Sequence, residues 1–188
     1  RNLSEVEAKQ TLYGAFKKAI DDLTIRDKGS AQIKNFISLR KAKPLVADSQ
    51  PYLVPQKSVF NKIIGDSKFE LEFAAFLENC SDIISFAKNY QSLGFKIEYQ
   101  AEDGNIHEFF PDFLIKKSES EIYIAETKGR EDLDDVRKIK RLQVWCNDVN
   151  AAQNEKKYIP LYVKQEVWEK HKEELKTFEK IIKIFSIK

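Results

Sequence analysis

The 188-residue sequence predicts an α/β domain, with a mixed sheet flanked by helices and a helical extension at its N-terminus. Three observations predict this fold. Apolar residues recur at helical spacing in three long segments, at 1–25, 67–90 and 132–154. Between the second and third segments, short apolar runs alternate with turn residues, which is typical of strands. A further apolar run at 158–163 indicates a strand after the third helix.

The N-terminal region is expected to be an extension of the main domain. Its helix begins with a capping-box pattern, Ser4 followed by Glu7, and ends before the turn residues at 27–30. Prolines interrupt residues 31–66, so only two short strands are expected there, at 52–54 and 59–64. We therefore predict an extension over 1–65 and a domain over 66–188.

The central strands are expected to form an antiparallel meander. Residues 95–100, 106–116 and 121–128 form three apolar runs joined by short turns, and such connections pair neighbouring strands antiparallel. The helix at 132–154 then crosses to the strand at 158–163, which predicts parallel pairing with the third strand. A C-terminal helix is expected over 165–180, followed by an apolar run at 181–187.

The composition excludes several classes of protein. Net charge is only +2, so any basic surface must be local. Two cysteines lie far apart without a CxxC spacing, which argues against a disulfide scaffold and a zinc site and favours a reducing, cytoplasmic setting. No apolar run approaches the length that spans a bilayer, so no membrane partner is expected. The chain lacks Met, which suggests a fragment or a trimmed N-terminus.

Asp112, Glu126 and Lys128 form the pattern that indicates chemistry. Asp112 follows Pro111 within an apolar strand, where an uncompensated carboxylate is costly. Glu126 and Lys128 share one face of the next strand because side chains alternate along a strand. Antiparallel pairing brings Asp112 near Glu126, and two converging carboxylates suit Mg²⁺. Lys128 could then orient or deprotonate a water. The alternative reading is an ordinary salt bridge of Lys128.

The residues Pro111-Asp112-Phe113 together with Glu126-Thr127-Lys128-Gly129 resemble the PD-(D/E)xK nuclease superfamily. The arrangement is most similar to the C-terminal endonuclease domains of type III restriction enzymes and similar helicase-linked nucleases. The segment DSKFELEF at 66–73 resembles the helix that precedes the sheet in those domains. The resemblance covers about 66–164 and implies a restriction-endonuclease-like core with a sheet of four to five strands.

The resemblance also implies the roles of individual residues. Asp112 and Glu126 would bind Mg²⁺, for which Mn²⁺ would substitute, with the backbone carbonyl of Thr127 as a further ligand. Lys128 would position the attacking water, and the products would carry a 5′-phosphate and a 3′-hydroxyl. Glu70, with Glu72 as the weaker candidate, would bind a second metal or a water. The alternative for Glu70 is a solvated helix face.

The helix after residue 129 suggests how double-stranded DNA could be held. Arg130, Lys138 and Arg141 are the candidate phosphate contacts, although four acidic residues at 131–135 balance their charge and favour a merely solvated face. No base-reading module or nucleotide-binding loop is visible in the sequence. Recognition would come from helicase and methyltransferase-specificity regions of a larger enzyme, and a homodimer is also open.

The sequence and the resemblance thus predict a magnesium-dependent DNA endonuclease domain, the cleavage module of a restriction or defence enzyme of the type III kind. Two alternatives stay open. One is a non-catalytic DNA-binding or scaffolding module with a nuclease fold, against which the intact Asp, Glu and Lys set argues. The other is a structure-specific repair or junction nuclease built on the same core.

Overall fold

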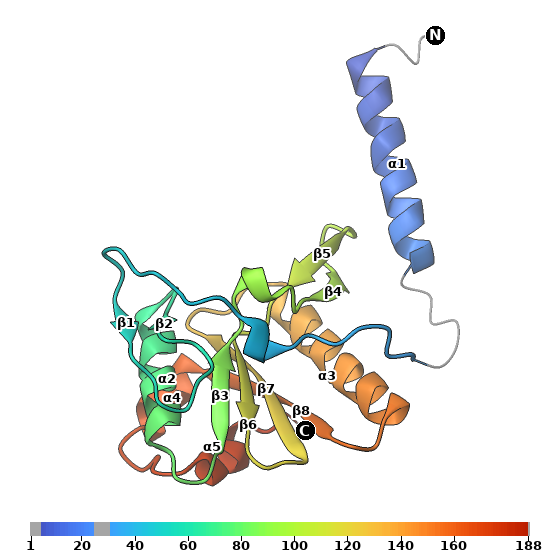
Figure 1. The fold of residues 1–188 in the computed structure, drawn as a ribbon. Helices are drawn as coiled ribbons and strands as arrows, with labels where there is room; N and C mark the ends of the chain where they lie inside the picture. Colours follow the sequence, from blue (N-terminus) through green and yellow to red (C-terminus); the bar gives the residue numbers. More distant parts are fainter. Residues whose placement is uncertain (1–4, 25–30, 188) are drawn as a thin grey trace.

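The computed structural model describes residues 5–24 and 31–187 (Figure 1). The elements follow in the order α1 (Val6–Thr24), η1 (Leu39–Lys41), β1 (Tyr52–Leu53), β2 (Ile63–Ile64), α2 (Lys68–Asn79), β3 (Ser85–Lys88), η2 (Gln91–Leu93), β4 (Ile97–Gln100), β5 (Ile106–Phe109), β6 (Phe113–Lys116), β7 (Glu121–Lys128), α3 (Asp135–Ala152), β8 (Lys157–Lys164), α4 (Gln165–His171) and α5 (Phe178–Phe185). In the described part of the chain, no helix is long and apolar enough to cross a membrane.

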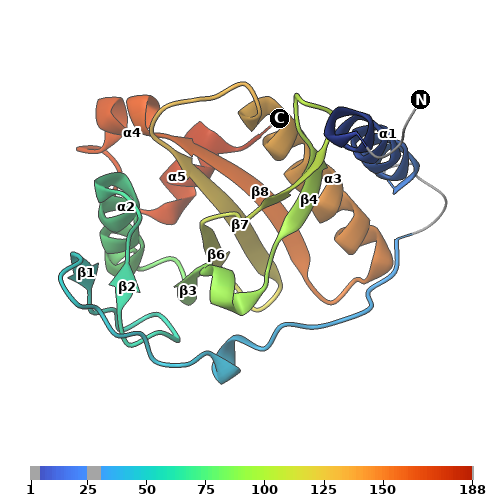
Figure 2. The ribbon, with the colours of Figure 1, turned by 90° about the horizontal axis from the view of Figure 1, so that it is seen from above.

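A four-stranded mixed sheet in the order β3-β6-β7-β8 forms the centre of the fold. β6 pairs antiparallel with both β3 and β7, whereas β7 and β8 run parallel because α3 crosses between them. Helices α2, α4 and α5 lie on one side of the sheet and α3 lies on the other (Figures 1 and 2). The predicted fold class, a mixed sheet flanked by helices with a helix at the N-terminus, is confirmed.

Each face of the sheet has its own apolar core. On the first face, Phe73 of α2 packs edge-on against Phe113 of β6 and Trp168 of α4, with ring centroids 5.4 and 5.7 Å apart. On the second face, Ile124 of β7 packs with Leu142 of α3 in a smaller cluster. Burial on both faces explains why the strands contain uninterrupted apolar runs, such as residues 122–125 of β7.

The segment predicted as one helix over 67–90 contains two elements. α2 ends at Asn79, and residues 85–88 form β3, so the helical prediction beyond residue 79 is wrong. β3 buries both Phe86 and Ala87 because the sheet is covered on both faces. A short run of this kind has no clear period of two, so its sequence does not distinguish a strand from a buried helix.

The predicted strand over 106–116 is also divided. β5 ends at Phe109 and β6 begins at Phe113, and Pro111 lies in the bend between them. Both predicted antiparallel pairings are present, β4 with β5 and β6 with β7. However, β4 and β5 form a separate two-stranded ribbon while β6 joins the central sheet, so the prediction of one continuous three-strand meander is wrong. Proline has no N–H to donate to a ladder, which explains why the pairing stops there.

The two ends of the chain differ in part from expectation. The single helix predicted over 165–180 is instead α4 and α5, and the last apolar run lies mostly within α5. α1 lies within the predicted first helix, whereas the capping residue Ser4 and the turn at 27–30 fall outside the described residues. β1 and β2 form near the predicted places. Phe60 and Ile63 belong to the main core, and the boundary after residue 65 stays a prediction.

Candidate active site

Asp112 lies at the bend between β5 and β6, where backbone groups of the neighbouring strands hold it. Its backbone carbonyl accepts a hydrogen bond of 2.7 Å from the N–H of Asn89, which follows β3. Its side-chain Oδ2 accepts two bonds from Thr127 of β7, from the backbone N–H at 2.8 Å and from the hydroxyl at 2.5 Å. The proline bend therefore leaves the carboxylate fixed at the end of the sheet.

The Asp112 carboxylate is in an unfavourable environment for its charge. Burial raises its pKa from the usual value to about 6, and the nearby Glu70 carboxylate adds to the rise. The bonds from Thr127 and the charge of Lys88 oppose the rise without cancelling it. A cation beside Asp112 would stabilise its ionised form.

Glu126 lies beside Asp112 in the adjoining strand. The Cα partner of Phe113 is Ala125, so the residues next to them, Asp112 and Glu126, meet where the pairing of β6 and β7 ends. Burial raises the pKa of Glu126 well above its usual value, and repulsion from Asp112 is the second cause. Glu126 Oε2 is buried and has no hydrogen-bond partner among the residues that the structure describes. A buried carboxylate oxygen of this kind needs a proton or a cation.

These features fit a divalent cation of the Mg²⁺ type. Among residues 5–24 and 31–187, no three His, Cys, Asp or Glu side chains form a group that could hold a metal. Two carboxylates and a backbone carbonyl would therefore be the protein ligands. Mg²⁺ commonly keeps several waters and uses only one or two carboxylates, so this donor set suits it. The roles of Asp112, Glu126 and Thr127 stay predictions.

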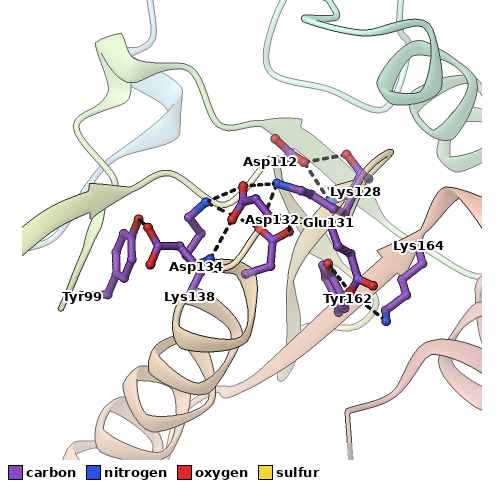
Figure 3. Close-up of polar contacts among 11 residues, drawn as sticks. Tyr99, Asp112, Lys128, Glu131, Asp132, Asp134, Lys138, Tyr162 and Lys164 are labelled. Carbon is purple, nitrogen blue, oxygen red and sulfur yellow. Dashed lines mark hydrogen bonds and ion pairs between the residues drawn. The ribbon is translucent and has the colours of Figure 1, made fainter. Parts of the chain in front are cut away.

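Lys128 lies on the same face of β7 as Glu126, at the end of the strand, where its amine contacts the start of α3 (Figure 3). Lys128 Nζ lies 2.8 Å from Asp135 Oδ1 and 3.0 Å from Asp132 Oδ2. Burial lowers the pKa of Lys128, but the bonds to these two aspartates outweigh burial and raise it overall. The charge of Lys128 also acts on Glu126. The predicted catalytic lysine is thus a charged group near the carboxylate pair, anchored from the side of α3.

Glu70 lies on α2, close enough to Asp112 for its charge to raise the pKa of the Asp112 carboxyl. It is buried, and its carboxylate accepts bonds from the Asp66 N–H at 3.1 Å and the Ser67 hydroxyl at 3.2 Å. These contacts hold the first turn of α2, and Glu70 Oε2 also forms an ion pair with Lys88 of β3. Glu72 instead forms a surface pair with Lys68 at 3.4 Å. Of the two, only Glu70 is placed near Asp112.

The three basic residues expected to contact DNA have different surroundings. Lys138 pairs with Asp132 at 3.4 Å and with Asp135 at 3.5 Å. Arg141 donates to the Glu98 carbonyl at 3.1 Å. Arg130 is exposed directly after the end of β7. Their contacts with phosphate stay predictions, and Arg130 is the most accessible of them.

Two charged residues near the site were not singled out in the sequence. Asp135 is 4% exposed although it belongs to a run of acidic residues that reads as a solvated helix face. Lys88 is 2% exposed and lies in the segment that was predicted as helix. A lysine among Phe86, Ala87 and Tyr90 was a usable signal, because a charged residue within an apolar run must find a partner.

The comparisons with known proteins agree with the fold. Residues 56–158 match a family described as an endonuclease domain, and this match spans β2 to the start of β8. No curated protein matches the chain. No solved structure matches it either.

Proposed function

The chain belongs to this endonuclease-domain family, and from that premise we propose that it is a Mg²⁺-dependent DNA endonuclease domain with a PD-(D/E)xK active site. The proposed site consists of Asp112 and Glu126 as metal ligands, the Thr127 carbonyl as a further ligand, and Lys128 as the basic group. DNA is the proposed substrate, and Mn²⁺ is expected to substitute for Mg²⁺.

One observation carries the proposal. Two acidic side chains, Asp112 and Glu126, lie together in a largely buried position, and burial raises the pKa of both. Glu126 Oε2 has no partner among the described residues. Adjacent buried carboxylates of this kind destabilise a protein unless a cation or a proton joins them. A divalent cation bound between the two carboxylates would compensate their charges, and the proposed nuclease requires such a cation.

Each side chain of the proposed site would have its own role in phosphodiester cleavage. Asp112 and Glu126 hold the cation at the sheet end, and the Thr127 hydrogen bonds keep Asp112 in one orientation. Lys128, anchored by Asp135, donates to the attacking water or to a phosphate oxygen near Glu126. When bound, Mg²⁺ supplies a more acidic water and stabilises negative charge on the phosphate. The expected products are a 5′-phosphate and a 3′-hydroxyl.

We also propose that the domain is the cleavage module of a larger restriction or defence enzyme of the type III kind. The resemblance of residues 66–164 to helicase-linked nucleases supports this assignment. Cys80 and Cys146 are buried and do not form a disulfide, which is consistent with a reducing, cytoplasmic setting. Helicase and methyltransferase-specificity regions would then select the DNA site.

A plasmid assay tests the function. The purified chain is incubated with supercoiled plasmid and Mg²⁺, Mn²⁺ or EDTA, and nicked and linear products are measured over time. We expect cleavage only with a divalent cation, and ligatable ends on the product. Asp112→Asn and Lys128→Met should each reduce the rate by about a hundredfold or more.

Glu72→Gln is the matched control, because Glu72 is a carboxylate on α2 outside the proposed site. It should cleave like the parent. Cleavage by Asp112→Asn at the parent rate would refute the proposed active site. Tight, metal-independent DNA binding without cleavage under any condition would favour a non-catalytic module instead.

A further inference from the structure

Lys88 is a buried positive charge in the central sheet. Its side chain is 2% exposed, and Nζ forms ion pairs with Glu70 Oε2 and, at 3.0 Å, with Asp66 Oδ2. Burial lowers the pKa of Lys88, but the bonds to Glu70 and Asp66 outweigh it and raise the pKa overall. The amine is therefore a cation at neutral pH.

The position of Lys88 links this cation to the proposed metal site. In the pairing of β3 with β6, Lys88 is the Cα partner of Phe113, which directly follows Asp112. Asn89, which directly follows Lys88, donates its N–H to the Asp112 carbonyl at 2.7 Å. The charge of Lys88 acts on Asp112 and stabilises its ionised form. Lys88 thus approaches Asp112 from the side of α2, whereas Lys128 is anchored on the side of α3.

Packing alone does not account for a lysine at this position. A buried ion pair is often no more stabilising than apolar residues of similar volume, because both charges lose their hydration. Lys88 faces two carboxylates, Asp66 and Glu70, and a third, Asp112, lies within electrostatic range. Without the amine, the Asp66 and Glu70 oxygens that now contact Nζ would face one point with no compensating charge. Mg²⁺ commonly uses only one or two carboxylates, so such a pair suits a divalent cation.

We propose that the Lys88 ammonium takes the place of a second divalent cation, so that the chain binds one metal ion, through Asp112 and Glu126, and holds Glu70 as the partner of Lys88. This inference rests on the proposed function and specifies its metal stoichiometry. Lys88 is a positioning residue: it neutralises Glu70, stabilises the charge of Asp112 and keeps a second ion out. Glu70 then orients Lys88 and is not a metal ligand.

Counting bound Mn²⁺ tests the proposal independently of catalysis. The full chain is cleared of metal with EDTA, and Mn²⁺ is titrated while free ion is measured by electron paramagnetic resonance. The parent should bind one Mn²⁺ per chain, and Asp112→Asn should abolish that binding. Lys88→Met should bind two, and the second ion should broaden the spectrum because two Mn²⁺ ions lie close together.

The double variant Lys88→Met with Glu70→Leu is the matched control. It removes both members of the ion pair, which avoids an unpaired buried charge, and it should bind one Mn²⁺ again. If Lys88→Met alone does not fold, a parent chain that binds two Mn²⁺ still overturns the proposal. The count is repeated with a bound phosphorothioate duplex, because a phosphate can contribute metal ligands.

The outcomes separate the two proposals. Two Mn²⁺ ions per parent chain, free or with DNA bound, would overturn the role of Lys88 and leave the proposed nuclease site intact. A folded Lys88→Met variant that still binds a single Mn²⁺ would overturn that role as well. A parent chain that binds no Mn²⁺ in either state would refute the proposed function, and the inference with it.

Discussion

Thr127 donates two hydrogen bonds to a single oxygen of Asp112, one from its backbone N–H at 2.8 Å and one from its hydroxyl at 2.5 Å. Both donors favour the ionised carboxylate, yet burial still raises the pKa of Asp112 to about 6. The Thr127 hydrogen bonds thus partly offset the rise that burial causes in the pKa of Asp112. It also fixes the direction in which the Asp112 carboxylate faces.

Replacing Thr127 with Val should weaken metal binding. Val keeps the branched shape and the backbone N–H but removes the hydroxyl, so the pKa of Asp112 should rise further and its orientation should loosen. Loss of a residue that orients a metal ligand typically reduces affinity about 10- to 100-fold, and a loss near tenfold is expected here. Mn²⁺ titration measures it. Thr127→Ser retains the hydroxyl and should bind within about threefold of the parent; equal loss in Val and Ser variants would contradict the role of the hydroxyl.

Asp112→Asn should change how the metal-free protein responds to pH. The pKa of Asp112 is raised in the folded state from 3.8 to about 6, so the folded state favours the protonated carboxyl. The stability that this protonation contributes is present below about pH 4 and is lost as pH rises through about 6. Asparagine cannot ionise and escapes this loss.

The free energy of unfolding, taken as variant minus parent, should therefore increase between about pH 4 and 7 by on the order of 1–3 kcal/mol. Urea unfolding in EDTA at several pH values measures the difference. Adding Mg²⁺ at pH 7 should stabilise the parent and not the variant. A difference that stays constant across this pH range would contradict the raised pKa of Asp112.

The positions of the proposed metal ligands could be predicted from local sequence. Glu126 and Lys128 lie at the end of β7, and a short turn joins β7 to β6, which begins directly after Asp112. The shared face of Glu126 and Lys128 follows from the two-residue period of strands, and the approach of Asp112 to Glu126 follows from the short connection between the strands. Both the period and the connection can be identified in the sequence. The parallel pairing of β7 with β8 also followed from a single intervening helix.

The surroundings of those ligands depend on contacts between distant segments. Lys88 meets Glu70 because β3 pairs with β6 and α2 packs over that edge, and neither contact is recorded in local periodicity. Asp135 resembles its exposed neighbours in sequence, but it is buried because Lys128 ends β7 beside the start of α3. Tertiary pairing thus decided which charged residues are buried.

Asp135→Asn should destabilise the fold more than Asp132→Asn does. Asp135 has a 5% exposed side chain, pairs with Lys128 at 2.8 Å and accepts the Asp132 N–H at 2.6 Å. Asparagine removes the charge that compensates Lys128, and a loss of about 2–3 kcal/mol is expected. Asp132 contacts the same lysine at 3.0 Å but has a 52% exposed side chain, so its loss should stay below about 1 kcal/mol. Urea unfolding measures both, and equal losses would contradict this ranking.

Arg130→Ala should weaken DNA binding more than Lys138→Ala. Arg130 is exposed beyond the end of β7, whereas Lys138 is already paired with Asp132 and Asp135 at 3.4 and 3.5 Å. A lysine with two carboxylate partners must leave them before it can contact a phosphate, which offsets much of its contribution.

Fluorescence anisotropy with a labelled duplex, in an Asp112→Asn background that prevents cleavage, measures the two losses at several salt concentrations. If Arg130 contacts one phosphate, its removal should reduce the slope of log K against log salt by about 1, because one fewer counterion is released. Lys183→Ala is the control: Lys183 is an exposed lysine on α5, across the sheet from α3, and its removal should leave the slope unchanged. A larger change for Lys138→Ala than for Arg130→Ala would place the DNA along α3 rather than beside the end of β7.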